Sequence, residues 1–298
     1  MNLPPKTVIF LHIPRTGGTT LQRIPERNYG RDRILTFYDF ERSAGVERFA
    51  RLPEPERAKY KFIKGHLYFG FHRFVPGDSA YATFLREPIA RASSFYRYAC
   101  THSDHYLYRS INEERLSLEA LLEREETSEL FNLQTRMIAG CVNDPRTSVD
   151  RAALERAKEN LRTHFCFVGL TEAFDASLLL LARTLGWRMP FYVRRNASGK
   201  ERRLNNVGDE QINGLLREAN ALDLELYAFA QELFEAQLRD AGDSMEREFR
   251  RFQKLNYLGG HVCESYQNFV HFVQQIVGRR QRATSVTALT QPHRDSTI

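Results

Sequence analysis

The feature that most constrains the fold is a short apolar segment that runs directly into a glycine-rich turn. Residues Thr7–Ile13 (TVIFLHI) are apolar and rich in β-branched side chains, which predicts a buried strand. The next residues, Pro14–Gly18 (PRTGG), predict a tight turn, and Thr19–Arg23 predicts a short helix that Pro25 ends. Strand, glycine turn and helix in this order predict an α/β unit with a ligand site at the turn.

The glycine turn has the composition of an anion-binding loop. Glycines let the backbone approach an anion closely, so that successive N–H groups and the helix N-terminus point at it. The hydroxyls of Thr16, Thr19 and Thr20 add donors, and Arg15 adds a fixed positive charge. The turn lacks the GK[ST] ending of a Walker A loop. Taken alone, it is also compatible with a plain connection between a strand and a helix.

A second polar segment follows another predicted strand, Ala80–Leu85. The segment Arg86–Tyr96 (REPIARASSFY) opens a helix with a proline in its first turn. Ligands of open α/β sheets bind at the carboxyl ends of the strands, where Arg86 leaves the strand. Ser94 follows about two helical turns later, so Arg86, Arg91 and Ser94 are expected to approach one phosphate. For either arginine alone, a surface position on a capped helix is the simpler interpretation.

Together the two segments resemble those of the sulfotransferases that use 3′-phosphoadenosine 5′-phosphosulfate (PAPS). The resemblance is closest to the carbohydrate branch with the heparan sulfate 2-O-sulfotransferases and their bacterial relatives. That family has a PKTGGT-like loop for the 5′-phosphosulfate and an LRDPxxRxxSxY-like segment for the 3′-phosphate. Here these segments are HIPRTGGTTL and FLREPIARASSFYRY. Two positions depart from the family pattern, because Arg15 replaces the loop lysine and Glu87 replaces the aspartate of RDP.

The resemblance covers about residues 7–240, through FNLQTRMIAG (131–140), FVGLTEAFDASLLLL (167–181) and LDLELYAFAQELF (222–234). It implies that PAPS is the donor and that the donor-binding residues are Arg15, Thr16, Gly17, Gly18, Thr19, Thr20, Arg86 and Ser94. It also places Thr171–Phe174 near the adenine end of the donor.

The resemblance also implies the catalytic residues. In the GH motif after the predicted strand Tyr60–Lys64, His66 takes the proton of the attacking hydroxyl, a role that suits imidazole near neutral pH. Arg15 is expected to stabilise the leaving phosphate oxygen. His72 is the alternative base, and His12 is interpreted as a packed core residue.

The resulting prediction is a sulfotransferase that transfers a sulfuryl group from PAPS, by in-line attack, to a hydroxyl of a carbohydrate or glycolipid. A P-loop nucleotide kinase-like enzyme is one alternative, against which the missing Walker lysine counts. A non-catalytic glycan- or nucleotide-binding protein of the same fold is another, against which the joint presence of Arg86, Ser94 and His66 counts. No metal is expected, because no His, Cys or carboxylate cluster has the spacing of a metal site.

The composition indicates the expected domain size, the kind of partner and the cellular location. The 298 residues are 42% hydrophobic, enough for one large domain, and the net charge of +6 suits an anionic partner. The motifs favour a nucleotide donor and a sugar acceptor over nucleic acid. The four cysteines form no CxxC pair and are expected to be reduced. No signal peptide and no apolar stretch of about 18 residues is seen, which predicts a cytoplasmic protein.

The order of the predicted elements favours an α/β fold with a mostly parallel sheet. The resemblance makes this a P-loop-like three-layer sandwich, with the sheet flanked by helices and a C-terminal helical extension. Further strands are predicted at 34–38, 60–64 and 165–168, helices at 117–140, 149–162, 171–185 and 210–241, and otherwise loops over 24–59. The expected division is a sulfotransferase domain, 1–242, and a helical extension with a basic, partly disordered tail, 243–298.

Three segments have two interpretations each. His102 and His105 lie in a polar segment (THSDHY) that lines an acceptor cleft or is simply solvated. The basic loop Arg194–Arg203 covers the donor, grips an acidic acceptor or is solvated. The apolar stripe Tyr266–Val277, followed by arginines, predicts a helix packed on the domain or on a partner, with peripheral contact at the inner membrane surface as the alternative.

Overall fold

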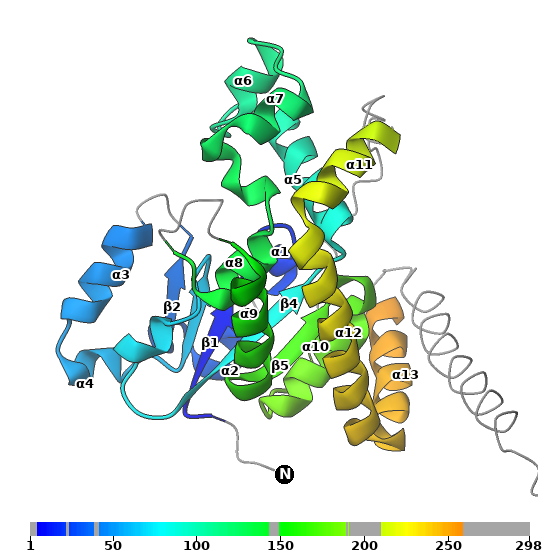
Figure 1. Cartoon of the computed structure of the whole chain (residues 1–298). Coiled ribbons are helices and arrows are strands. Elements are labelled where there is room, and N and C mark those ends of the chain that lie inside the picture. The colour runs from blue at the N-terminus through cyan, green and yellow to red at the C-terminus, as the bar shows by residue number, and fades with distance from the viewer. Residues whose placement is uncertain are drawn as a thin grey trace, which may run out of the picture.

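The computed structural model describes residues 5–21, 24–38, 42–142, 149–188, 190 and 210–258. Its centre is a five-stranded parallel sheet with the strand order β2-β3-β1-β4-β5 (Figure 1). The strands are β1 (Thr7–Leu11), β2 (Ile34–Phe37), β3 (Phe62–Gly65), β4 (Ser79–Leu85) and β5 (Phe165–Leu170). Helices flank the sheet, so the predicted α/β class is confirmed, and every strand pair is parallel.

The helices connect the strands and cover the sheet. Their bounds are α1 (Gly18–Leu21), α2 (Glu26–Tyr29), α3 (Arg42–Arg51), α4 (Glu54–Arg57), α5 (Pro88–Thr101), α6 (Tyr108–Asn112), α7 (Leu118–Glu123), α8 (Leu133–Ala139), α9 (Arg151–Thr163), α10 (Phe174–Thr184), α11 (Glu210–Ala219), α12 (Ala221–Ala241) and α13 (Asp243–Leu258). Short 3₁₀ turns are η1 (Arg31–Arg33), η2 (Phe71–Phe74), η3 (Glu125–Leu130) and η5 (Thr171–Ala173).

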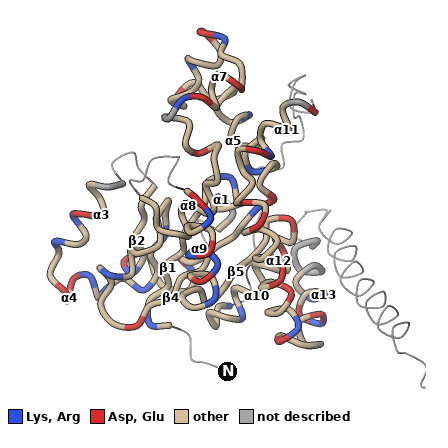
Figure 2. The backbone as a smooth tube through the Cα atoms, in the orientation of Figure 1, with Lys and Arg blue, Asp and Glu red and all other residues tan. Residues whose placement is uncertain are grey.

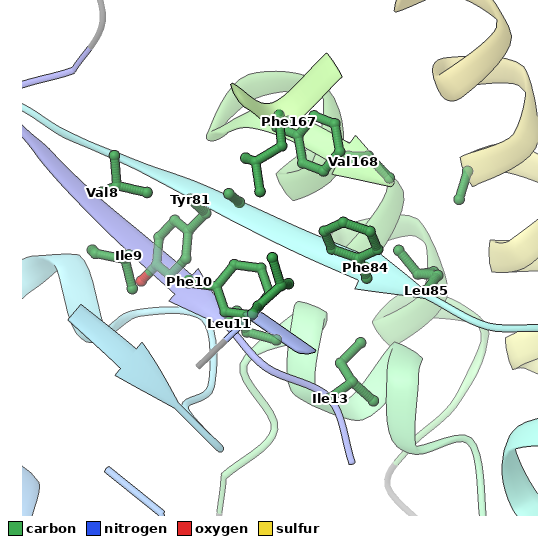
Figure 3. Packing of buried hydrophobic residues seen from close by; sticks show 14 of the residues in the cluster. Val8, Ile9, Phe10, Leu11, Ile13, Tyr81, Phe84, Leu85, Phe167 and Val168 are labelled. Atoms are coloured by element: carbon green, nitrogen blue, oxygen red, sulfur yellow. The ribbon is translucent and has the colours of Figure 1, made fainter. Parts of the chain in front are cut away.

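Aromatic side chains fill the sheet's core on one face. All five residues of β1 are buried, as a central parallel strand requires. The Phe10 ring lies 6.2 Å from those of Phe62 and Phe84. Figure 3 shows Phe10 of β1 and Phe84 of β4 near each other in this core. Tyr29 of α2 stacks on Phe62, and Phe174 of α10 contacts Phe84. Because side chains alternate along a strand, α2 and α10 cover this one face.

The opposite face and the outer edge are closed by other segments. Tyr81, three positions before Phe84 on β4, points to the opposite face, where Phe69 packs on it at 5.2 Å between centroids. At the outer edge of β5, the Gln237 side chain of α12 accepts from the Val168 N–H and donates to the Val168 carbonyl. The side chain thus pairs backbone groups that an edge strand leaves open.

A helical lobe rises from the carboxyl edge of the sheet (Figure 1). It contains α5, α6, α7, η3 and α11, and it has an apolar cluster of its own that includes Phe95, Leu107, Leu121 and Leu216. The amino end of α5 joins this lobe to β4. The lobe therefore stands over the edge at which the sequence predicts ligand binding.

Two predicted segments differ from the structure. The predicted helix 117–140 is broken into α7, η3 and α8, because Asn132 adopts left-handed backbone angles (φ 38°) just before α8. The stretch 24–59, predicted as loops around one strand, also contains α2, α3 and α4. Phe49 of α3 stacks on Phe71 and packs against Phe37, and such tertiary contacts stabilise a helix whose local pattern is weak.

The predicted C-terminal extension begins with a packed helix. Met245, Phe249 and Phe252 of α13 are buried in the same core as the sheet. The stripe Tyr266–Val277, the tail after it and the basic loop Arg194–Arg203 lie outside the described residues. The division at residue 242 stays a prediction.

Charge does not mark one face of the described chain. Figure 2 shows Lys and Arg interspersed with Asp and Glu along the helices. Many of these charges form exposed pairs within one helix, such as Arg109 with Glu113, and such pairs stabilise little. None of the described helices has the length and apolarity needed to cross a bilayer. The described cysteines, Cys100, Cys141 and Cys166, are free thiols.

Candidate active site

The glycine turn curls over the carboxyl end of β1. Arg15 (φ 72°) and Gly17 (φ 82°) both adopt left-handed backbone angles. A Cβ on Gly18 would lie 1.9 Å from Nε2 of His12, so this position admits only glycine. The Thr16 hydroxyl is buried and donates to the Ile13 carbonyl at 2.8 Å, which ties the turn together. α1 begins at Gly18 and continues through Thr19 and Thr20, and backbone N–H groups at a helix start favour anions.

Arg15, Arg86 and Ser94 come together from the two segments that the sequence singled out. Nε of Arg15 donates to Oγ of Ser94 at 3.1 Å, and Nη1 of Arg86 donates to the Arg15 carbonyl at 3.1 Å. The Arg15 guanidinium also lies 4.8 Å from the ring centroid of Tyr98, one turn beyond Ser94 on α5. These three predicted donor residues, from the β1–α1 and β4–α5 connections, therefore form one group.

The electrostatics of this group suit an anion. Burial lowers the pKa of Arg15, and the positive charges of Arg86 and Arg97 lower it further, while Tyr98 acts in the opposite direction. Guanidinium groups held close together repel each other, and a bound phosphate or sulfate relieves that repulsion. Planar guanidinium groups also donate two parallel hydrogen bonds to such an anion. The charges of the cluster are thus compatible with the predicted phosphate ligand.

His66 directly follows β3, the strand next to β1, and so lies at the same carboxyl edge of the sheet as the glycine turn. Its backbone N–H donates to the Phe37 carbonyl at 2.9 Å, and its ring Nδ1 lies 2.9 Å from the His12 carbonyl oxygen. A carbonyl oxygen can only accept a hydrogen bond, so the contact assigns the proton to Nδ1. Nε2 is then the nitrogen with a lone pair. The ring of Tyr38 meets His66 edge-on at 5.0 Å and helps to fix its orientation.

A model of the galactose-3-O-sulfotransferase family matches residues 2–276. This chain belongs to that family. The match confirms the prediction that the chain is a member of a carbohydrate sulfotransferase family.

Named relatives agree with the family assignment. Galactose-3-O-sulfotransferase 3 of Bos taurus is 29% identical over 267 residues, which cover 83% of this chain and 61% of the relative. The Homo sapiens protein of the same name is 29% identical over 276 residues, 85% of this chain and 63% of the relative. Heparan-sulfate 6-O-sulfotransferase 2 of Homo sapiens is 29% identical over 147 residues, 45% of this chain and 24% of the relative. The chain spans less than two thirds of the length of these relatives.

In this member of the galactose-3-O-sulfotransferase family, the backbone of Arg86 is held by a buried glutamine. The Arg86 N–H donates to Oε1 of Gln134 at 3.0 Å, and Nε2 of Gln134 donates to the Arg86 carbonyl at 2.9 Å. Asp223 of α12 accepts from the backbone N–H groups of Gln134 and Thr135 and so caps the start of α8. Asn132 accepts in return from the N–H groups of Leu222 and Asp223. Asn132 and Gln134 thus connect α8 to α12 and to the start of the Arg86 segment.

Arg91 does not join the donor group. Its side chain is fully buried at the base of the lobe, and Nη2 donates to the Glu129 carbonyl at 2.6 Å. Burial lowers the pKa of Arg91 to about 10, although the charges of Asp223 and Glu129 act against this change. Of the three residues that were expected to approach one phosphate, Arg86 and Ser94 remain.

The alternative base, His72, lies at the other end of the sheet. Its Nδ1 is 3.1 Å from the Tyr81 hydroxyl, and its ring stacks on His164, which precedes β5. Tyr81 and His164 mark the amino ends of β4 and β5, whereas Arg15 and Arg86 lie at the carboxyl edge. The geometry therefore favours His66 over His72.

His12 is packed among other rings, as the sequence predicts, and one of these rings is that of the candidate base. Its ring stacks on His66 at 4.9 Å between centroids, and no described residue offers a hydrogen-bond partner to its buried Nδ1. Burial lowers the pKa of His12 well below 6.5, with smaller effects from the positive charges of His66, Lys64 and Arg15. In the sequence, the position of His12 shortly before the glycine turn indicates that it lies near the carboxyl end of β1.

Two further predictions concern the segment Thr171–Phe174 and the absence of a metal. Thr171 donates to the Leu85 carbonyl at 3.0 Å, and Glu172 accepts from the Glu87 N–H at 3.0 Å, so this segment is tied to the start of α5. Among the described residues, no group of three or more His, Cys, Asp and Glu side chains is placed to hold a metal. Metal independence stays a prediction.

Proposed function

We propose that this chain transfers a sulfuryl group from PAPS to a hydroxyl of a carbohydrate acceptor. The observation that supports it most is the joining of Arg15, Arg86 and Ser94 into one cationic group at the carboxyl edge of the sheet. The names of the relatives, which transfer sulfate to galactose or heparan sulfate, support a sugar as the acceptor.

The residues present fit a donor with phosphate groups at both ends of its ribose. Gly17, Gly18 and the first turn of α1 suit the 5′ end, because backbone N–H groups at such a turn bind anions. Arg86 and Ser94, at the start of α5, suit the 3′-phosphate. Bound PAPS supplies the activated sulfuryl group, and the residues of this chain hold and orient it.

His66 is the proposed general base. Its Nδ1–H bond to the His12 carbonyl holds the ring in the tautomer with a lone pair on Nε2. Nε2 accepts the proton of the acceptor hydroxyl as the new oxygen–sulfur bond forms and the bond from sulfur to the phosphate oxygen breaks. Arg15 is the proposed charge that stabilises the departing phosphate oxygen.

The two alternatives make different predictions. A kinase-like enzyme binds ATP with Mg²⁺ in preference to PAPS, and family membership counts against it. A non-catalytic protein binds the product nucleotide, 3′-phosphoadenosine 5′-phosphate (PAP), but shows no turnover. Cytoplasmic location and membrane contact through the C-terminal segment are further proposals.

The test combines binding and turnover. Calorimetry with PAP is expected to give saturable binding to the wild type and about 10- to 150-fold weaker binding to Arg86→Ala, since a charge-assisted hydrogen bond contributes about 1.5–3 kcal/mol. Arg31→Ala, which removes an arginine that is 87% exposed, is the matched control and is expected to bind normally. Transfer of labelled sulfate from PAPS to sugars then tests activity. Equal affinity of the wild type and Arg86→Ala contradicts the donor assignment.

A further inference from the structure

The side chain of His12 fills the space between the candidate base and the glycine turn. On one side, its ring stacks on that of His66, with centroids 4.9 Å apart and 27° between the planes. On another side, its outer edge lies against Gly18. A Cβ at Gly18 would be 1.9 Å from Nε2, 2.2 Å from Cε1 and 2.4 Å from Cδ2 of this ring. The His12 ring therefore packs against both the base and the turn that is proposed to hold the donor.

The backbone of His12 holds only one atom of the His66 ring. The His12 N–H donates to the Gly65 carbonyl at 2.9 Å, and the His12 carbonyl oxygen accepts from Nδ1 of His66 at 2.9 Å. A hydrogen bond to a carbonyl oxygen tolerates a broad range of directions, so this bond alone lets the His66 ring tilt. The stacked ring of His12 removes that freedom, because it lies along the face of His66.

Other rings hold His12 in its turn. Phe10 lies two positions earlier on the same face of β1, and its ring stacks on His12 at 6.2 Å. Tyr38 meets the rings of His12 and His66 edge-on, at 5.4 Å and 5.0 Å. Rings packed this closely have few alternative positions. The place of His12 is thus defined by the core, and His12 in turn defines the place of His66.

The charges around His12 favour its neutral form. Burial lowers its pKa most, and the positive charges of His66, Lys64 and Arg15 lower it further. A neutral ring can remain stacked on His66 when His66 takes up a proton, whereas a charged ring would repel it. His12 is therefore suited to support a neighbour whose charge changes during a reaction.

We infer that the side chain of His12 is a positioning residue, which sets the orientation of His66 and its separation from the glycine turn. Its carbonyl fixes the tautomer of His66, and its ring fixes the plane. The inference rests on the proposed function, because it takes His66 as the base. The effect of His12 on the His66 ring can nevertheless be measured without turnover.

The test is a double-mutant cycle on the full chain. It compares the wild type with His12→Ala, His66→Ala and the variant that carries both changes, and His12→Asn keeps a flat polar group in part of the space of the ring. His164→Ala is the matched control, since it removes a ring that stacks on His72 at the amino edge of the sheet. Transfer of labelled sulfate from PAPS to methyl β-galactopyranoside measures kcat and KM. Calorimetry measures the affinity for PAP, and thermal melting checks the folding of each variant.

His12→Ala is expected to lower kcat about 10- to 100-fold with KM for PAPS changed less than about 3-fold, because a base misplaced by about 1 Å acts poorly only in the transition state. In the His66→Ala background the same change should lower kcat less than about 2-fold, because the residue through which it acts is gone. His12→Asn should fall between the wild type and His12→Ala. His164→Ala should match the wild type.

NMR of protein with isotope-labelled histidines supplies the readout without turnover. The His66 signals, assigned by their loss in His66→Ala, should show the single tautomer with the proton on Nδ1 in the wild type. In His12→Ala they should show both tautomers in exchange, because the ring can then turn away from the carbonyl oxygen. The control His164→Ala should leave these signals unchanged.

Two results overturn the inference. One is an equal fold-loss of kcat from His12→Ala in the wild-type and His66→Ala backgrounds, which shows that His12 acts on the fold and not through His66. The other is an unchanged His66 tautomer in His12→Ala. If His12→Ala does not fold, His12→Asn replaces it in the cycle and in the NMR comparison. If the wild type neither binds PAP nor transfers sulfate, the proposed function fails, and the NMR comparison still decides whether His12 orients His66.

Discussion

Arg15 and Ser94 are joined by a hydrogen bond of 3.1 Å from Nε to Oγ, although 79 positions separate them in the chain. Arg15 belongs to the turn after β1, and Ser94 lies two turns into α5, after β4. Because β1 and β4 are neighbours in the sheet, their carboxyl ends bring the two segments together. A substitution of Ser94 by a residue without a hydroxyl therefore also removes a hydrogen bond of Arg15 in the glycine turn.

Ser94→Ala is expected to weaken PAP binding and to lower turnover, because it removes both a donor to phosphate and the partner of Arg15. The loss of one hydrogen bond to a charged group corresponds to a Kd about 10- to 150-fold higher. Ser93→Ala is the matched control, since Ser93 is equally buried in the same helix. Calorimetry with PAP measures both variants. Equal losses in the two variants indicate a general effect on α5 and contradict the role of Ser94.

His66→Ala is expected to bind PAP like the wild type and to lose about 10²- to 10⁴-fold in turnover, the usual contribution of a general base. His72→Ala is the control, because His72 lies at the amino edge of the sheet, and it should retain turnover. Labelled sulfate transfer at saturating PAPS measures both. Normal turnover in His66→Ala with an inactive His72→Ala assigns the base to His72.

Gln134→Leu is expected to lower both stability and donor affinity. It leaves the N–H and the carbonyl of Arg86 without their partner, and each buried unpaired group costs about 1–3 kcal/mol. Gln237→Leu is the matched control, since it breaks the same two kinds of bond at Val168, far from the donor group. Both variants should melt at lower temperature, and only Gln134→Leu should weaken PAP binding. An unchanged affinity for PAP in Gln134→Leu shows that the glutamine does not position Arg86.

His12 should make folding stability depend on pH. Its pKa in the folded chain lies well below the unfolded value of 6.5, so the unfolded chain binds more protons as the pH falls below 6.5. The contribution of neutral His12 is present above pH 6.5 and is lost as the pH falls below that value. Urea unfolding of His12→Asn should show a smaller loss of stability from about pH 7.5 to 5 than the wild type. His102→Asn, at an exposed position, is the control, and identical slopes in wild type and His12→Asn contradict the prediction.

Treatment with EDTA is expected to leave sulfate transfer unchanged, because Arg15, Arg86 and the backbone of the turn supply the charge that a metal supplies in phosphoryl transfer. The assay compares turnover before and after EDTA and after added Mg²⁺. Loss of transfer that Mg²⁺ restores supports the kinase-like alternative.

Local patterns were enough to predict the sheet strands and the two polar segments that meet at the carboxyl edge of the sheet. The strand at Thr7–Ile13, the turn at Pro14–Gly18 and the helix after Arg86 depend on side-chain polarity, glycine content and proline position, all of which are local properties. Family membership was predictable for the same reason, because each of the two motifs is a continuous stretch of sequence.

The chain order alone does not determine which side chains meet. Gln134 supports Arg86, Arg91 turns into the lobe, and His12 stacks on His66, and each contact joins elements that are far apart in sequence. The helix α3 likewise depends on Phe71 for the packing of Phe49. Such contacts are decided by the order of strands in the sheet and by the packing of helices on it, and a local pattern contains neither. The sequence by itself therefore determined the strands and the two motifs at their ends. Only the tertiary structure decided helices such as α3 and which side chains of the two motifs come together, because both depend on contacts between distant parts of the chain.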